Sequence, residues 1–277
     1  MALDNRRIEF TIIKDDIVKK MLAIIALGSA LTASASSPSV HQINELIKKN
    51  HAGWIARENA ISEMSDAEIK RLLGSTDLPS DNALYEDRSA ANDAIDWRNV
   101  NGVNWLGPVM NQGNCGSCVA FAAVATLESS YRIQSGLNWL MPTFSTQQLF
   151  NCGGGVCDNG WWPGGAANML KTKGIVDAAC VPYESGSTGE DIQCKKNFCQ
   201  NQSERTYKIE NFTSPSFWGG SAAKVKEALK KGPLVTTLNV YEDFLFYSSG
   251  IYKSVSRKSV GGHAVSLVGF NDEGRYW

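Results

Sequence analysis

The stretch "NQGNCGSC" (111–118) carries two cysteines, two glycines and side-chain amides, and the apolar, alanine-rich run "VAFAAVATLESSY" (119–131) follows it at once. Three interpretations compete for Cys115 and Cys118. They are half of a metal site, a redox dithiol, or a disulfide cysteine beside a reactive thiol. The rest of the chain has to decide between them.

The zinc interpretation would use Cys115, Cys118, Cys152 and Cys157, but the sequence has no second close pair of cysteines and no pair of histidines at zinc spacing. A thioredoxin-like dithiol requires a βαβ context that the residues before Cys115 do not supply. The third interpretation requires an imidazole. His263, 145 residues beyond Cys118, is the one histidine that follows residue 51.

Four stretches resemble the papain family of cysteine proteases: "IDWR" (95–98), "NQGNCGSC", "DFLFYSSGIY" (243–252) and "GGHAVSLVGF" (261–270). The motif C-G-[SA]-C-[WY], with a histidine roughly 130–150 residues further on, is the signature of this family, and this chain matches its first four positions. Residues 43–75 resemble the short propeptide of its cathepsin B-like branch, with "LLG" (72–74) in the expected place. The resemblance covers about residues 40–277.

The resemblance implies an α+β, papain-like two-lobe fold, with a helical left lobe, a β-rich right lobe that is incomplete, and a short helical propeptide in front. It implies Cys118 as nucleophile, His263 as its acid–base partner and Gln112 as an oxyanion donor. We expect substrate contacts from Asn159, Gly160, Trp161 and Trp162, the two tryptophans walling a hydrophobic pocket. The implied disulfides are Cys115–Cys157, Cys152–Cys194 and Cys180–Cys199. No cofactor and no metal are implied.

The chemistry agrees with those roles. A thiol at the start of a helix and beside an imidazole is stabilised as thiolate by the helix dipole and the imidazolium charge. Taken alone, each residue has a plainer reading: Cys118 as a buried thiol, His263 as a core histidine, Gln112 as a surface amide. For Trp162 a core position is about as probable as a pocket wall.

The net charge of −1 gives no electrostatic reason to expect a nucleic-acid or anionic-membrane partner. The run "MLAIIALGSALTASA" (21–35) follows Lys19–Lys20 and ends in Ala-Ser-Ala, which indicates a signal peptide and not a membrane anchor. Met21 is therefore an alternative start to Met1. We expect a secreted protein or one in a lysosome- or vacuole-like compartment. The sequons at Asn201 and Asn211 carry little weight.

Three segments are expected: a leader and signal peptide (1–35), a propeptide and linker (36–93), and a peptidase domain (94–277). Capping boxes at 39–42 and 65–68 predict two short amphipathic propeptide helices. In the body we expect helices over 118–135, 145–152, 164–174 and 221–233, with a third capping box at 145–148. Strands are expected over 234–240 and 263–270. The partners would be protein or peptide substrates and the propeptide as inhibitor.

The sequence departs from the family pattern at Val119, where an aromatic residue is usual, and beyond "EGRYW" (273–277), where the family continues to an Asn-Ser-Trp-Gly motif. We therefore expect residues 1–277 alone to hydrolyse little or no peptide. Two rival functions remain: a catalytically inactive, protease-derived binding protein, and a secreted disulfide-rich adhesive protein. The interval between Cys180 and Cys194 is too short for a cathepsin B occluding loop, which predicts an endopeptidase.

Overall fold

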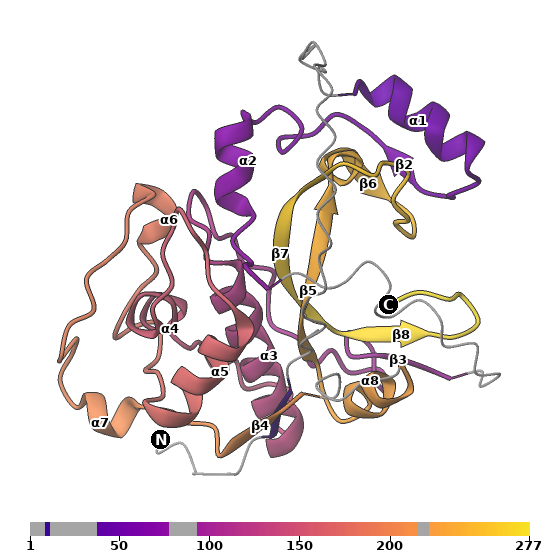
Figure 1. Ribbon diagram of the computed structural model, residues 1–277. Helices are drawn as coiled ribbons and strands as arrows, with labels where there is room; N and C mark the ends of the chain where they lie inside the picture. Colours follow the sequence, from indigo (N-terminus) through magenta and orange to yellow (C-terminus); the bar gives the residue numbers. More distant parts are fainter. Residues whose placement is uncertain (1–8, 12–37, 78–92, 215–221) are drawn as a thin grey trace, which may run out of the picture. The chain divides into compact units, whose positions relative to one another are not determined.

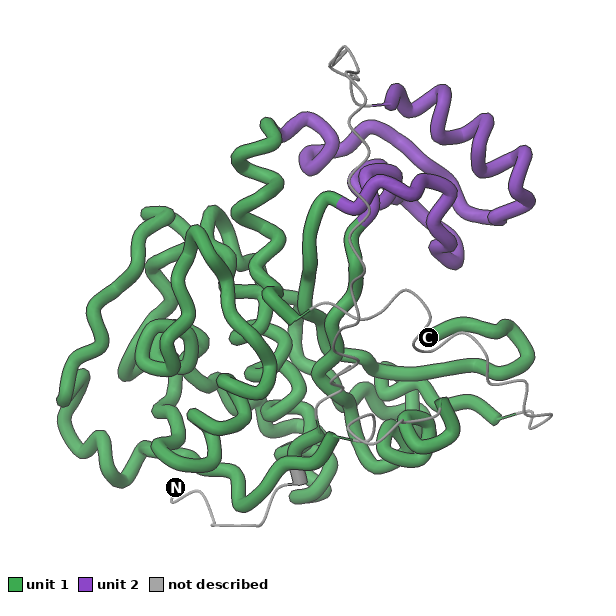
Figure 2. Tube along the Cα trace, in the orientation of Figure 1, with its two compact units in different colours: residues 1–15, 65–240, 260–277 green, residues 16–64, 241–259 purple. Residues whose placement is uncertain are grey.

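The computed structural model describes residues 9–11, 38–77, 93–214 and 222–277, which fall into two compact units (Figures 1 and 2). Unit 1 contains the described parts of residues 1–15, 65–240 and 260–277. Unit 2 contains those of residues 16–64 and 241–259. The predicted signal peptide lies outside the described residues.

The helices of unit 1 come mainly from the first half of the predicted body. They are α2 (Asp66–Leu72), α3 (Cys118–Ser135), α4 (Thr146–Gly153), α5 (Pro163–Thr172), α6 (Ser185–Thr188), α7 (Gln202–Arg205) and α8 (Ala222–Leu229). Helices α3, α4 and α5 pack against one another around buried Leu127, Leu149 and Leu170. Helix α3 is buried on most of its circumference, as expected of a helix that is apolar nearly all round.

The strands of unit 1 form three pairs. Strand β1 (Glu9–Thr11) runs parallel to β4 (Asn211–Thr213), β3 (Ala94–Asp96) runs antiparallel to β8 (Gly269–Asn271), and β5 (Leu234–Tyr241) pairs with β7 (Ser259–Leu267). A second core of Trp97, Val225, Leu229, Leu234 and Phe270 joins α8 to this β-rich part. Strand β1 belongs to the predicted leader, yet its Phe10 is buried in the core of the helices.

Unit 2 combines the predicted propeptide with a segment of the predicted body. Its elements are α1 (Val40–Lys49), β2 (Ile55–Ala56), the 3-10 helix η1 (Glu242–Phe246) and β6 (Tyr247–Ser249), with β2 antiparallel to β6. The Trp54 indole N–H donates to the Lys253 carbonyl oxygen at 2.9 Å, and its ring meets Tyr252 edge-on at 5.1 Å. The propeptide helix α1 and the Trp54 segment therefore share one core with residues 241–259.

The two propeptide capping boxes form as predicted. The Ser39 and Ser65 side chains each accept a hydrogen bond from the backbone N–H three residues further on. The Gln42 and Glu68 side chains in turn accept from the backbone N–H of Ser39 and Ser65. The third prediction is only half right. Ser145 caps α4, but the Gln148 side chain accepts from the Val176 N–H at 2.7 Å and does not return to Ser145.

The protein therefore has an α+β fold, in which α3, α4 and α5 precede the paired strands β5 and β7 in the order that the sequence predicts. The two units do not coincide with the three predicted segments, because α2 groups with the body and residues 241–259 group with the propeptide. Packing units and processing units need not match, so the three-segment division stays a prediction. Among the described residues, no helix has both the length and the apolar character that crossing a membrane requires.

Candidate active site

The two cysteines of "NQGNCGSC" differ: Cys115, in the loop before α3, is disulfide-bonded, and Cys118 is free. Cys115 is bonded to Cys157, and the next N–H along the chain, that of Gly116, donates to the Cys157 carbonyl oxygen at 2.9 Å. Gly113 has φ +60°, and a Cβ there would lie 2.3 Å from the Gly186 carbonyl oxygen, so this turn requires glycine. Cys118 is the first residue of α3 and is the free cysteine.

The disulfides are the three that the family resemblance implies: Cys115–Cys157, Cys152–Cys194 and Cys180–Cys199. Three of the four cysteines that a zinc site would need are thus bonded to other cysteines. The metal interpretation of the Cys115–Cys118 pair is therefore wrong for this structure.

The Cys118 thiol is almost completely buried, with 1% of the residue exposed. Burial raises the pKa of Cys118 to about 11, against the opposing effect of the backbone N–H groups of Ala264, Gly74 and Val119, which favour the thiolate. The sequence predicted a thiolate stabilised by its imidazole partner. In the structure Cys118 is a neutral thiol at neutral pH, because the chain that covers it removes water.

The imidazole of His263 comes from β7, one residue before the Ala264 N–H that faces Cys118. Its Nδ1 lies 3.1 Å from the Leu72 carbonyl oxygen, and since a carbonyl only accepts, Nδ1 carries the hydrogen. Burial lowers the pKa of His263, and the bond to Leu72 opposes that shift only in part. The imidazole is therefore neutral at neutral pH.

Gln112 converges on the same oxygen atom. Its side-chain Nε2 donates to the Leu72 carbonyl at 3.2 Å and to the Cys115 carbonyl at 2.9 Å. The amide of Gln112 and the imidazole of His263 thus both bind one main-chain carbonyl of the predicted propeptide. A carbonyl oxygen between these donors has the surroundings that an oxyanion-binding site needs.

Residues after Leu72 continue past Cys118 as an extended chain. The Ser75 N–H donates to the Gly262 oxygen at 3.1 Å, the Trp161 N–H donates to the Gly74 oxygen at 2.7 Å, and the Thr76 N–H donates to the Trp161 oxygen at 3.0 Å. A Cβ on Gly74 would lie only 1.9 Å from the Gly116 oxygen. Glycine at position 74 is therefore what allows the chain to pass so close to the loop before Cys118.

The four predicted substrate-contact residues have different surroundings. A Cβ on Gly160 would lie 2.0 Å from the Gly74 oxygen, so Gly160 permits close approach of an extended chain, and Asn159 is exposed beside it. The Trp161 side chain is 4% exposed and packs edge-on against Phe150, so its main chain and not its indole faces the propeptide. Trp162 is 44% exposed. Their roles toward a substrate stay predictions.

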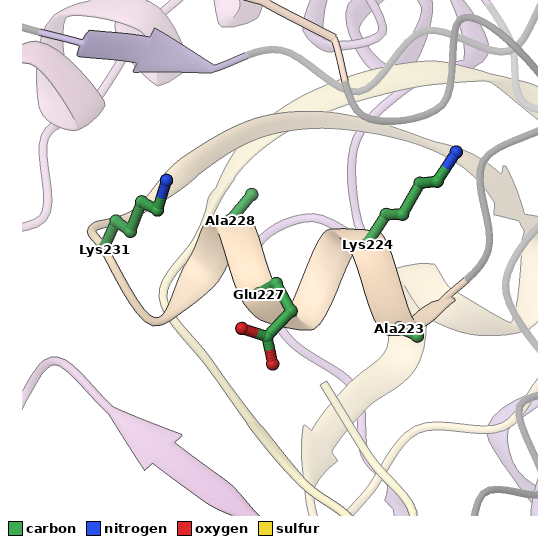
Figure 3. Close-up of a pocket in the computed structure, with 5 residues that line it drawn as sticks. All are labelled: Ala223, Lys224, Glu227, Ala228 and Lys231. Atoms are coloured by element: carbon green, nitrogen blue, oxygen red, sulfur yellow. The ribbon is translucent and has the colours of Figure 1, made fainter.

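The sequence did not identify Tyr183, Ala264 or Gly262 as parts of the site. Tyr183 lies in "CVPYES" (180–185), outside the four stretches that carry the family resemblance, and the two β7 residues are neighbours of His263. A hollow of about 340 Å³ lies on α8 and is lined by Ala223, Lys224, Glu227, Ala228 and Lys231 (Figure 3). No predicted site residue lines it.

Comparison with known proteins agrees with this geometry. The chain belongs to the papain family of cysteine proteases, whose model, described as "Papain family cysteine protease", matches residues 91–277. It is a papain-like cysteine endopeptidase by that membership.

Its relatives are cathepsin B-like. It is 32% identical over 266 residues to cathepsin B-like CP3 of Giardia intestinalis, covering 91% of this chain and 86% of the relative. It is 28% identical over 286 residues to cathepsin B-like protease 1 of Arabidopsis thaliana, covering 84% and 74%. Procathepsin B S9 of Trypanosoma congolense, 22% identical, has the same fold with a TM-score of 0.67, covering 86% and 85%.

Proposed function

We propose that this chain is the zymogen of a cathepsin B-like cysteine endopeptidase, in which Cys118 and His263 hydrolyse peptide bonds and residues 36–93 act as inhibitor. The observation that carries the proposal is the shared acceptor. The Leu72 carbonyl oxygen accepts from both Gln112 and His263, and Gly74 of the same segment faces the Cys118 sulfur.

The proposed reaction begins when a substrate peptide replaces the 72–76 segment. The Cys118 thiol gives its proton to His263, and the resulting thiolate attacks the scissile carbonyl carbon. The negative charge that develops on the carbonyl oxygen is stabilised by the Gln112 amide and the Cys118 N–H. His263 gives its proton to the departing amine, which leaves an acyl group on Cys118. A water molecule, deprotonated by His263, then releases the acyl group and restores the thiolate.

The latent form has a physical basis in the same contacts. With residues 72–76 in place, burial favours the neutral thiol of Cys118 and the neutral imidazole of His263. A substrate carbonyl would have to displace the Leu72 oxygen from both donors. Removal of the segment would let water reach the Cys118 thiol and bring the thiol under the positive charge of a protonated His263. Both effects lower the pKa of the thiol.

An oxidising compartment suits this function. Three disulfides tie the loops around Cys118 to the rest of unit 1, and bonds of this kind persist in secreted proteins and in the secretory pathway. The signal-like run at 21–35 supports the same destination, either outside the cell or in a lysosome- or vacuole-like compartment.

The test is hydrolysis of a fluorogenic peptide by the protein expressed from its complete reading frame, before and after removal of the prosegment. We expect hydrolysis to appear on removal, and Cys118→Ala and His263→Ala each to lower kcat by about 10³-fold or more. Lys70→Ala, at an exposed position of α2, is the matched control. Its prosegment should be removed, and the peptide hydrolysed, as in the wild type. Undiminished hydrolysis by Cys118→Ala would overturn the proposal. A processed protein that binds peptides and cleaves none would favour the binding-protein alternative.

A further inference from the structure

The phenol of Tyr183 connects the two chain segments that the proposed oxyanion site uses. Its hydroxyl donates to the Gln112 carbonyl oxygen at 2.8 Å and lies 2.6 Å from the Ser117 hydroxyl. A phenol has one proton, which goes to the carbonyl, so Ser117 is the donor in the second bond. Gln112 carries the side-chain donor, and Ser117 is the N-cap residue directly before Cys118.

The ring of Tyr183 is held in place by its neighbours. Phe121, on the first turn of α3, meets it edge-on at 4.8 Å with an interplanar angle of 83°. On the other side, a Cβ on Gly186 would lie 2.6 Å from a Tyr183 ring carbon, so the backbone packs closely there. Burial raises the pKa of Tyr183, so the phenol keeps its proton at neutral pH.

The Tyr183 segment is attached to the Gln112 loop a second time. The Asn114 N–H donates to the Gly186 carbonyl oxygen at 2.8 Å, and the Gln112 side chain is itself braced by the Cys115 carbonyl. The direction of the Gln112 amide therefore depends on where the backbone of residues 112–115 is held. Tyr183 is the group that ties that backbone to the start of α3.

We infer that Tyr183 is a positioning residue of the oxyanion site. It holds the side-chain N–H of Gln112 and the backbone N–H of Cys118 at the separation that one substrate oxygen requires. The inference rests on the proposed function, since it assigns a purpose to the two donors named there. Tyr183 neither gains nor loses a proton in the reaction. Its effect is preorganisation, on which the stabilisation of a developing oxyanion depends.

The test is Tyr183→Phe in the processed enzyme from the complete reading frame. Deleting an oxyanion donor lowers kcat by about 10²–10³-fold, and loosening one should lower it by about 10-fold with KM changed by less than about 2-fold. A peptide aldehyde, whose adduct with Cys118 places an oxygen in the same site, should bind about 10-fold more weakly. Alkylation of Cys118 by iodoacetamide, which forms no oxyanion, should keep its rate and its pH profile.

Two further variants sharpen the result. Tyr207→Phe also deletes a hydroxyl at a buried tyrosine of unit 1, but that hydroxyl has no hydrogen-bond partner within the described part of the chain, so kcat should stay at the wild-type value. Ser117→Ala removes the other arm of the bridge and should lower kcat in the same direction, with alkylation retained. It also keeps the question testable if Tyr183→Phe does not fold.

Different results would contradict the role of Tyr183 and the proposed protease function. Wild-type hydrolysis together with unchanged kcat and aldehyde affinity in Tyr183→Phe would overturn the inference alone. A parallel fall in kcat and in the alkylation rate would also overturn it, because the residue would then only support the fold around Cys118. Absence of any Cys118-dependent hydrolysis in the wild type would overturn the proposed function and this inference with it.

Discussion

Nδ1 of His263 lies 3.1 Å from the carbonyl oxygen of Leu72, a residue 191 positions earlier in the chain. The same oxygen accepts from the Gln112 amide at 3.2 Å. One main-chain carbonyl thus satisfies two donors of the proposed active site at once. Both donors are half-buried, so a competing carbonyl has to replace Leu72 at both of them or leave one unpaired, which is costly.

Gly74→Ala should weaken inhibition by the prosegment. The added methyl group would lie 1.9 Å from the Gly116 oxygen, which belongs to the backbone of the nucleophile loop and cannot rotate away. Overpacking of this kind costs about 1–3 kcal/mol, so the inhibition constant of a peptide of residues 38–77 should rise by about one order of magnitude or more. The measurement is inhibition of the processed enzyme by that peptide added separately.

Lys70→Ala is the control for this prediction, since Lys70 is exposed on α2, the short helix that ends two residues before Gly74. Its peptide should inhibit like the unmodified one. Equal inhibition by the Gly74→Ala peptide would mean that the segment does not run past Gly116 in solution.

Cys118 should react slowly with alkylating reagents in the unprocessed protein. With a pKa of about 11, only about one part in 10⁴ is thiolate at pH 7, and the rate should rise about 10-fold per pH unit up to pH 11. After processing, the rate at pH 7 should be much higher and nearly independent of pH above neutrality. The measurement is mass-spectrometric labelling with iodoacetamide, with Cys118→Ala as the unlabelled control because the other six cysteines are bonded. Equal labelling rates at pH 7 before and after processing would contradict the burial argument.

What the sequence predicted well depends on local chemistry or on a strong motif. The capping boxes at Ser39 and Ser65 are contacts over three residues, so the pattern alone determines them. A spaced motif marks Cys118 and His263, and their catalytic roles stay a prediction. The role of Gln148 was predicted wrongly because a distant donor, the Val176 N–H, binds its side-chain oxygen instead.

The rest of the site depends on contacts between segments far apart in the chain. The neutral state of Cys118 follows from its burial, which no local pattern reveals. The burial of the Trp161 indole depends on Phe150 and the surrounding core, whereas an exposed and a buried tryptophan look the same in sequence. Tyr183 bonds to residues 66 and 71 positions earlier in the chain and carries no motif of its own.

Arg71→Ala should weaken the prosegment slightly and in a salt-dependent way. Its guanidinium lies 2.9 Å from the Asp158 carboxylate and donates to the Gly189 carbonyl at 3.2 Å. Both side chains are partly exposed, so the pair contributes about 0.2–1 kcal/mol, equivalent to a rise of about 1.5- to 5-fold in the inhibition constant. The effect should shrink from low salt to about 0.5 M salt, and Asp158→Asn in the enzyme should reproduce it. A loss that is equally large at both salt concentrations would show that the contact is not mainly electrostatic.

Glu128→Gln should stabilise the protein at neutral pH and not at acidic pH. Burial raises the pKa of Glu128 to about 7, although the Phe144 N–H and the Arg132 charge favour its ionised form. A carboxyl whose folded-state pKa is raised stabilises the fold fully below its unfolded pKa, and that contribution is lost as the pH rises from about 4.5 through about 7. The loss is on the order of 3 kcal/mol.

The measurement is the free energy of unfolding in urea at pH 4 and pH 7.5. The Gln side chain can still accept from the Phe144 N–H, so the variant should match the wild type at pH 4 and exceed it at pH 7.5. Glu227→Gln on α8 is the control and should show no such difference, since Glu227 is largely exposed. A gain of the same size at both pH values would assign the effect to packing and not to ionisation.

The interval between Cys180 and Cys194 bears on how the substrate is cut. In cathepsin B, which this chain resembles, an occluding loop with two adjacent histidines binds the substrate's C-terminal carboxylate. Here the interval reads "VPYESGSTGEDIQ" (181–193), with no histidine and with Glu184, Glu190 and Asp191. It forms the short helix α6, and its Gly186 oxygen accepts from Asn114.

We therefore expect the processed enzyme to cut within chains and to lack carboxydipeptidase activity. A carboxylate arriving near this segment would meet the like charge of Glu184, Glu190 and Asp191, which gives some repulsion. The measurement compares one peptide with a free and with an amidated C-terminus, the products being identified by mass spectrometry. Both forms should be cleaved at the same internal bonds and at similar rates. Replacing Glu184, Glu190 and Asp191 by Gln or Asn should raise the rate on the free-acid peptide slightly and leave the amidated one unchanged. Stepwise loss of dipeptides that amidation abolishes would show that a carboxylate-binding group exists elsewhere in the protein.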